Sequence, residues 1–192
     1  MLDTAPCVRW ASAKTEVAHT FVGLVVIARS FDDEPGASWG RVALSAAVLG
    51  AAIGAATVFI DGMGNQAAAT EWARKPDPGT FGSASAVATI SLSMFTGLMF
   101  TTFGLTPLLF GVTGLASRQY PKWLGYLALL SGLLGILAGS IQFLAGFSGL
   151  TANILFPISS IAFSVWTLLM GLQLWKRGNR STEPVREATA VS

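Results

Sequence analysis

The chain has 192 residues, of which 52% are hydrophobic and only 11% are charged. Soluble domains usually have about a quarter of their residues charged, so this composition excludes an ordinary water-soluble fold. The net charge of +2 comes from basic residues that flank apolar segments, and no basic stripe with interleaved aromatic residues predicts a nucleic-acid-binding surface. We therefore expect an all-α integral membrane protein.

Residues 1–41 are predicted to form an N-terminal arm with one short hydrophobic or interfacial helix. Residues 1–13 have no pattern, which is typical of a poorly ordered end. The apolar run 21–28 is too short to cross a bilayer, which takes about 20 residues. It fits an interfacial helix, an incomplete span, or a signal segment with a poor cleavage site. Residues 32–36, three acidic residues followed by Pro35 and Gly36, predict a turn that ends any helix.

The first predicted span covers residues 42–60 and is closed by Asp61 and Gly62. Ala46, Gly50 and Gly54 recur every four residues, an arrangement that lets two helix backbones approach closely in lipid. We expect this face to pack inside the subunit, with a homodimer interface as the alternative. Asp61 is interpreted as a solvated helix end, and contact with a cation or a polar headgroup is the alternative.

A polar connection is predicted over residues 61–81, with a short helix at 65–75 capped by Asn65 and ended by Pro76. The second span covers about residues 84–114 and is long enough to require tilting. Its hydroxyl-bearing face includes Ser93, Gly97 and Thr101, which could bond to a neighbouring helix or to their own backbone. Pro107 predicts a kink, which is a functional hinge only in the alternative interpretation.

The third span covers residues 123–147 and contains no Asp, Glu, Lys, Arg or His. Gln142 lies deep in this span and is expected to hydrogen-bond between helices, with a ligand contact as the alternative. Gly135 and Gly139 are predicted helix-packing positions. A connection at 148–151 leads to the fourth span, 153–175, and residues 178–192 are predicted to be a disordered cytoplasmic tail. The bundle of antiparallel helices thus covers residues 42–177.

Basic residues mark one side of the predicted bundle. With four spans, the same side receives Arg41, Arg118, Lys122, Lys176, Arg177 and Arg180. The positive-inside rule makes this side cytoplasmic. We therefore expect a multi-pass protein of a bacterial inner membrane with both termini in the cytoplasm.

Candidate chemistry is sparse, and we predict no catalytic, cofactor-binding or metal-binding residue. The spans contain no Asp, Glu, Lys, Arg or His, the groups that proton relays use. The chain has one histidine and one cysteine, His19 and Cys7, which are too few for a Cys-rich or imidazole metal site. We therefore expect a protein that is not an enzyme.

Three segments are similar to a known group of bacterial membrane proteins: residues 58–72 (VFIDGMGNQAAATEW), residues 120–130 (YPKWLGYLALL) and the LWKR sequence that ends at Arg177. They resemble domain-of-unknown-function family 4386, over roughly residues 40–177. The resemblance implies a multi-spanning bacterial protein and no particular activity.

Two functions remain open at the level of sequence. The first is association with a partner through helix packing, the partner being a second copy or another membrane protein within the lipid bilayer. The alternative is a carrier or pore for a small neutral or apolar molecule. A carrier predicts a cavity beside Ser93, Thr101 and Gln142, whereas a packing protein predicts that neighbouring helices cover these groups.

Overall fold

The computed structural model describes residues 22–146 and 154–190, with side chains as far as residue 179. The described residues are helical without a strand, which confirms the all-α fold. The predictions for residues 1–13, for the connection at 148–151 and for His19 and Cys7 lie outside the described residues. Helical residues 22–29 precede the elements α2 (Ala37–Phe59), η1 (Ile60–Gly64), α3 (Asn65–Arg74), α4 (Pro78–Leu98), η2 (Met99–Leu105), α5 (Thr106–Ala116), α6 (Lys122–Ala145) and α7 (Phe156–Ala190).

The first span continues well beyond its predicted end at residue 60. The π-helix η1 joins α2 to α3, so one helical segment runs over 38 residues from Ala37 to Arg74. The predicted polar connection at 61–81 is therefore wrong over most of its length. The short helix was correctly located, but Asn65 is not its cap, because its backbone is helical (φ −65°, ψ −37°). No strong helix breaker occurs before Pro76, so the alanine-rich sequence continues the helix.

The second helical segment, Pro78–Ala116, is 39 residues long and begins six residues before the predicted span. Asp77 starts it with a capping box: its Oδ1 atom accepts hydrogen bonds from the backbone N–H groups of Gly79 and Thr80, both at 2.9 Å. Pro78 occupies the first turn, where a missing N–H is harmless. These residues are sufficient to begin a helix in a sequence that otherwise resembles a loop.

The last two helices agree with the predicted spans more closely. Helix α6 ends before Gly146, whose φ of +76° favours glycine. Helix α7 has Pro157 in its first turn and continues to Ala190, although a disordered tail was predicted from residue 178. Good helix formers such as Arg186, Glu187 and Ala188 favour this extension, whereas Pro184 within it removes one backbone hydrogen bond.

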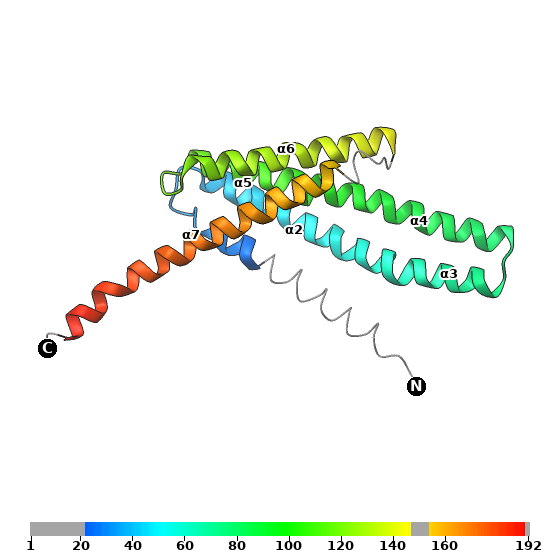
Figure 1. Ribbon diagram of the computed structural model, residues 1–192, viewed down its shortest axis with the longest axis horizontal. Coiled ribbons are helices and arrows are strands. Elements are labelled where there is room, and N and C mark those ends of the chain that lie inside the picture. The colour runs from blue at the N-terminus through cyan, green and yellow to red at the C-terminus, as the bar shows by residue number, and fades with distance from the viewer. Residues whose placement is uncertain (1–21, 147–153, 191–192) are drawn as a thin grey trace.

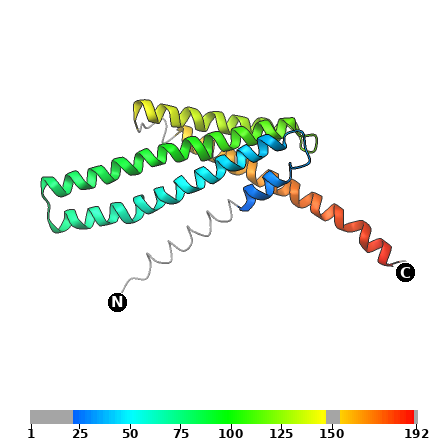
Figure 2. The same ribbon diagram turned by 180° about the vertical axis from the view of Figure 1, so that it is seen from behind.

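The helices form an elongated antiparallel bundle in which α6 packs against α5 and α7, and α2 packs against α4 and α5 (Figure 1). The hairpin of α3 and α4 extends beyond the other helices at one end in both views (Figures 1 and 2). At the opposite end, α7 projects away from the bundle. We call the first end the hairpin end and the second the basic end, after its Arg and Lys residues.

Residues 22–29 pack into the bundle. Leu24 and Ile27 are buried on the same cluster as Phe110 and Trp166, whose rings lie 5.5 Å apart. Phe31 follows this helix and packs 5.0 Å from the ring of Tyr120. The short helix is therefore part of the protein core.

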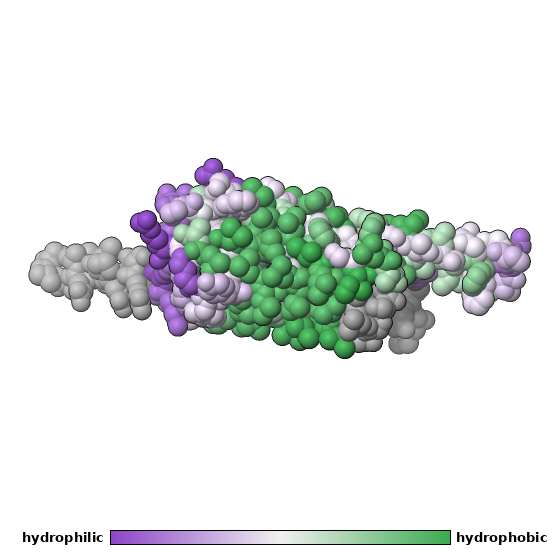
Figure 3. Space-filling view, turned by 90° about the horizontal axis from the view of Figure 1, so that it is seen from above, coloured by the Kyte–Doolittle hydropathy of each residue, from purple (hydrophilic) through white to green (hydrophobic). Residues whose placement is uncertain are grey.

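The surface agrees with a membrane-embedded protein. A band of hydrophobic residues covers the middle of the molecule, and hydrophilic residues lie towards its ends (Figure 3). Among the described residues, four helical segments are long and apolar enough to cross a membrane. Exposed Trp39, Trp123 and Trp175 stand near the basic end of three of them, as expected for aromatic residues at a membrane interface.

Candidate functional site

Glycines allow the continuous η2–α5 segment and α6 to contact each other backbone to backbone. A Cβ atom built at Gly135 would lie 2.1 Å from the carbonyl oxygen of Phe103, and one at Gly132 would lie 2.5 Å from the nitrogen of Leu108. At Gly111 the corresponding distance to the nitrogen of Leu129 is 2.7 Å. We call this contact the glycine seam. It leaves no space for a passage between these two helices.

The other predicted packing residues also lie between helices. Ala46 is buried, and a Cβ atom at Gly50 would lie 2.2 Å from the Oγ1 atom of Thr102. The corresponding distance from Gly54 to a methyl carbon of Leu98 is 3.1 Å, and that from Gly139 to Phe100 is 3.3 Å. The face of α2 that carries small residues is thus covered within the subunit.

The π-helix η2 immediately precedes Pro107 and changes the hydrogen-bond pattern there. Pro107 is buried at the start of α5 and lacks an N–H group to donate. The hydroxyl of Thr106 donates to the carbonyl oxygen of Thr101 at 2.9 Å, a bond that spans five residues. The backbone N–H of Thr106 donates to the same carbonyl oxygen, so both donors of Thr106 close the π-turn at Thr101.

A cavity of about 510 Å³ lies between the α4–η2 segment and α6. Predicted site and packing residues line it together with several others: Ser93, Thr96, Gly97, Phe100, Thr101, Gly139, Ser140, Phe143 and Leu144. The hydroxyls of Ser93 and Thr101 donate to the carbonyl oxygens of Thr89 and Gly97, at 2.9 and 2.8 Å. Their donor capacity is thus used within the helix, and the cavity offers mainly apolar contacts.

Gln142 does not line this cavity. It is 4% exposed, and its amide oxygen and nitrogen have no hydrogen-bond partner among the described residues. About three turns earlier on α6, Ser131 and the facing Ser159 of α7 exchange hydrogen bonds with each other's carbonyl oxygens, at 3.0 and 3.1 Å. The interhelical polar contact that sequence analysis assigned to Gln142 is made here by this serine pair, which it missed.

Asp61 lies within the helical segment, in η1, and is exposed. Its Oδ1 atom accepts hydrogen bonds from Asn65 and from the buried Ser91 of α4, each at 3.0 Å. The bond to Ser91 joins η1, which precedes α3, to α4. Asp61 therefore has a structural role, and no group of three or more Asp, Glu, His or Cys side chains that could hold a metal ion occurs in the described part of the chain.

At the basic end, Glu34 connects the segment that follows helical residues 22–29 to the connection between α5 and α6 by hydrogen bonds. Its Oε2 atom accepts hydrogen bonds from the backbone N–H of Arg118 at 2.9 Å and from the hydroxyl of Ser117 at 3.3 Å. The bond from the Arg118 backbone is the main reason why the pKa of Glu34 is lowered. Nearby, the guanidinium of Arg177 lies 4.3 Å from the centre of the Tyr120 ring and bonds to Gln119. Sequence analysis treated these residues only as an acidic turn and as topology markers.

These arrangements can bind apolar groups and can hold helices together. Two serine hydroxyls contact carboxylates, Ser91 at Asp61 and Ser117 at Glu34, and both contacts join separate segments of the bundle. A scan against protein-family models found no match, and searches of curated proteins and of solved structures found none either. The resemblance to family 4386 stays a prediction.

Proposed function

We propose that this membrane-embedded protein is not an enzyme and acts by association, with a second copy of itself as the partner, through the hairpin of α3 and α4. The observation that carries the proposal is the uncovered state of this hairpin. Within α3 no residue is buried, and within α4 only Ser91 is. Large apolar side chains remain exposed along the hairpin and the adjoining η1, among them Met63 of η1, Trp72 of α3 and Phe81 of α4.

The charges of the hairpin favour a second copy as the partner. Lys75 pairs with Asp77 at 3.5 Å, but Glu71 and Arg74 are exposed and have no ion-pair partner among the described residues. In a two-fold symmetric interface each residue meets a residue of the other copy reciprocally. Glu71 of one copy can then face Arg74 of the other, while the exposed aromatic rings cover each other.

The test is disulfide cross-linking in membranes, in a Cys7→Ser background. We expect Thr70→Cys on α3 to form a linked dimer under mild oxidation, whereas the control Gly178→Cys, exposed at the opposite end, should not. Adding Glu71→Arg should reduce the linked fraction, and further adding Arg74→Glu should restore it, because the charges are then exchanged. A chain that stays monomeric with Thr70→Cys in place would overturn the proposal.

The alternative is a carrier for a small apolar molecule, and the cavity of about 510 Å³ beside Ser93 and Thr101 favours it. Its size lies within the usual range of small-molecule sites. Filling it by Gly97→Leu should then abolish uptake of an apolar dye into vesicles that contain the protein. The closed glycine seam argues against a continuous pore between α5 and α6. We therefore place association first.

A further inference from the structure

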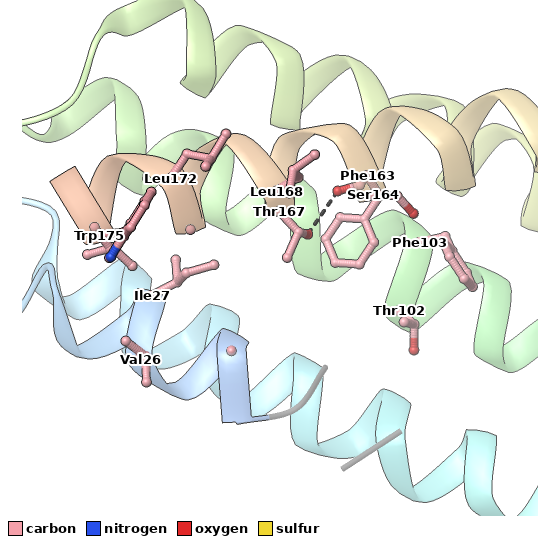
Figure 4. Close-up of a pocket in the computed structure, with 13 residues that line it drawn as sticks. Val26, Ile27, Thr102, Phe103, Phe163, Ser164, Thr167, Leu168, Leu172 and Trp175 are labelled. Atoms are coloured by element: carbon pink, nitrogen blue, oxygen red, sulfur yellow. Dashed lines mark hydrogen bonds between the residues drawn. The ribbon is translucent and has the colours of Figure 1, made fainter. Parts of the chain in front are cut away.

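A second and larger hollow lies near the basic end, between the short helix of residues 22–29 (the first helix) and α7. It has a volume of about 890 Å³, and residues of η2 form its floor (Figure 4). The first helix contributes Val26 and Ile27, η2 contributes Phe103, and α7 contributes Phe163, Leu172 and Trp175. We call this hollow the groove. Its lining is predominantly apolar. The polar side chains that line it are those of Thr102, Ser164 and Thr167.

Two glycines keep the groove open. Gly23 of the first helix and Gly171 of α7 both line it, and a Cβ atom at either position would have no other atom within 4 Å. This differs from the glycine seam, where the same atom would collide with backbone. At Gly135 glycine permits close helix contact, whereas at Gly23 and Gly171 its small size adds to an existing space.

The groove reaches the interface level of the bundle. Trp175 lines it and is 67% exposed, as expected for a residue among lipid headgroups. Lys176 follows Trp175 directly, and Arg29 follows Ile27 by two residues, so each wall is followed along the chain by a basic residue that does not itself line the groove. Both are exposed and neither has an ion-pair partner among the described residues.

The acidic residues at the same end do not cancel this charge. Asp32 pairs with Arg41 at 3.6 Å, and Glu34 accepts hydrogen bonds from the Arg118 backbone and from Ser117. Asp33 is exposed, but Arg118, Lys122 and Arg177 also lie at the basic end. The end of the bundle at which the groove opens is therefore basic overall, which favours an anionic occupant. Basic pockets between membrane helices are known to recognise anionic lipid headgroups.

We propose that the groove binds an acyl chain of an anionic phospholipid, with the phosphate at Arg29 and Lys176. The apolar walls cover the chain, and long basic side chains at helix ends reach the headgroup level. An uncharged lipid would use the walls but would gain nothing from the two cations. The site is thus expected to prefer phosphatidylglycerol to phosphatidylcholine.

The probe is phosphatidylglycerol added to the full chain in detergent, with phosphatidylcholine as the comparison lipid. Native mass spectrometry measures the fraction of protein that carries each lipid. We expect tighter binding of phosphatidylglycerol to the wild-type chain. Gly171→Leu should remove binding of both lipids, because its side chain fills the groove without a clash.

Two further variants distinguish the contribution of the apolar walls to lipid binding from that of the two basic residues. Gly82→Leu is the control for Gly171→Leu, since it makes the same change on α4 at a glycine that also has no atom within 4 Å of a built Cβ. It should bind lipid like the wild type. The double variant Arg29→Gln and Lys176→Gln should lose about tenfold in its preference for phosphatidylglycerol, since each basic residue near a membrane surface contributes to the attraction.

Three results would overturn the proposal. The first is undiminished phosphatidylglycerol binding by Gly171→Leu, which would place the lipid elsewhere. The second is an unchanged lipid preference in the double variant, which would remove the anionic headgroup from the site. The third is a wild-type dimer that Gly171→Leu separates, because the groove would then hold a helix of a second copy.

Discussion

The glycine seam and the α3–α4 hairpin are both antiparallel helix pairs, but they differ in how closely the chains meet. In the seam, glycine brings backbone against backbone, and a Cβ atom at Gly135 or Gly132 would overlap the neighbouring chain. In the hairpin, Ser91 is the only buried residue of α4, and a built Cβ at Gly82 meets nothing within 4 Å. Small residues can therefore have two different effects in a helix pair. In the seam they let two helices pack closely inside the subunit, whereas in the hairpin they leave helix faces exposed.

The difference follows from the physics of a bilayer. Lipid chains are as apolar as leucine side chains, so helices associate through close packing and hydrogen bonds. The seam satisfies this requirement by itself. The hairpin does so only through a few contacts, such as the bond from Ser91 to Asp61. Its exposed faces are consequently available to a partner.

The largest expected effect comes from Gly135→Ala. The added methyl group would lie 2.1 Å from the Phe103 carbonyl oxygen, so the helices must separate, and we expect a loss of stability of about 3 kcal/mol. The control Gly82→Ala, in the hairpin, should be neutral or slightly stabilising, because alanine is the better helix former. Thermal unfolding in detergent measures both. Equal melting temperatures for the two variants would contradict the distinction between seam and hairpin.

Gly50→Ala should have an intermediate effect. The new methyl group meets the Oγ1 atom of Thr102 at 2.2 Å, and a side chain can move more readily than backbone. We expect a loss of about 1 to 2 kcal/mol. Adding Thr102→Ala removes the colliding oxygen, which has no hydrogen-bond partner among the described residues, and should recover part of this loss. A double-mutant cycle measures the coupling, and strictly additive effects would show that the two residues do not collide.

The sequence predicted the helical fold and the approximate spans because length and apolar content determine them. It also predicted small residues at helix contacts, such as Gly50, since their spacing of four residues marks one helix face. It failed at the ends of the long helices. Asp61 and Gly62 suggested a helix end, but a π-turn carries the chain onward, and the side chain of Asp61 finds its partner 30 residues away in Ser91.

The candidate sites were less predictable for a related reason. Ser93 and Thr101 could be assigned to one helix face from the sequence, and both line a cavity. The groove combines Ile27, Phe103 and Trp175 from three distant segments, and no periodic pattern connects them. Long-range contacts of this kind depend on how whole helices cross, which one sequence does not specify.

Glu34→Gln should have a smaller effect that depends on pH. Hydrogen bonds from the Arg118 backbone and from Ser117 hold the pKa of Glu34 below its ordinary value of 4.5. A lowered pKa in the folded protein means that the carboxylate stabilises the fold above the ordinary value. This contribution is lost as the pH falls through the lower folded pKa.

Melting temperatures over a pH series measure the contribution of Glu34. The wild-type chain should exceed Glu34→Gln in melting temperature at neutral pH, and the difference should shrink below about pH 4.5. Asp33→Asn, at the neighbouring exposed position, is the control and should follow the wild type. A difference that persists unchanged in acid would show that the charge of Glu34 is not what fastens the α5–α6 connection.

The smallest expected effect is that of Asp77→Ala, which removes the capping box at the start of α4. The backbone N–H groups of Gly79 and Thr80 lose their acceptor, so the first turn of α4 should open more often. Hydrogen exchange should become several-fold faster there and stay unchanged in α5 and α6. Asp77→Asn keeps an acceptor oxygen and should exchange nearly like the wild type. If Asp77→Ala instead accelerated exchange at the glycine seam, the hairpin and the seam would unfold as one unit, and the hairpin could not act as an independent surface for a partner.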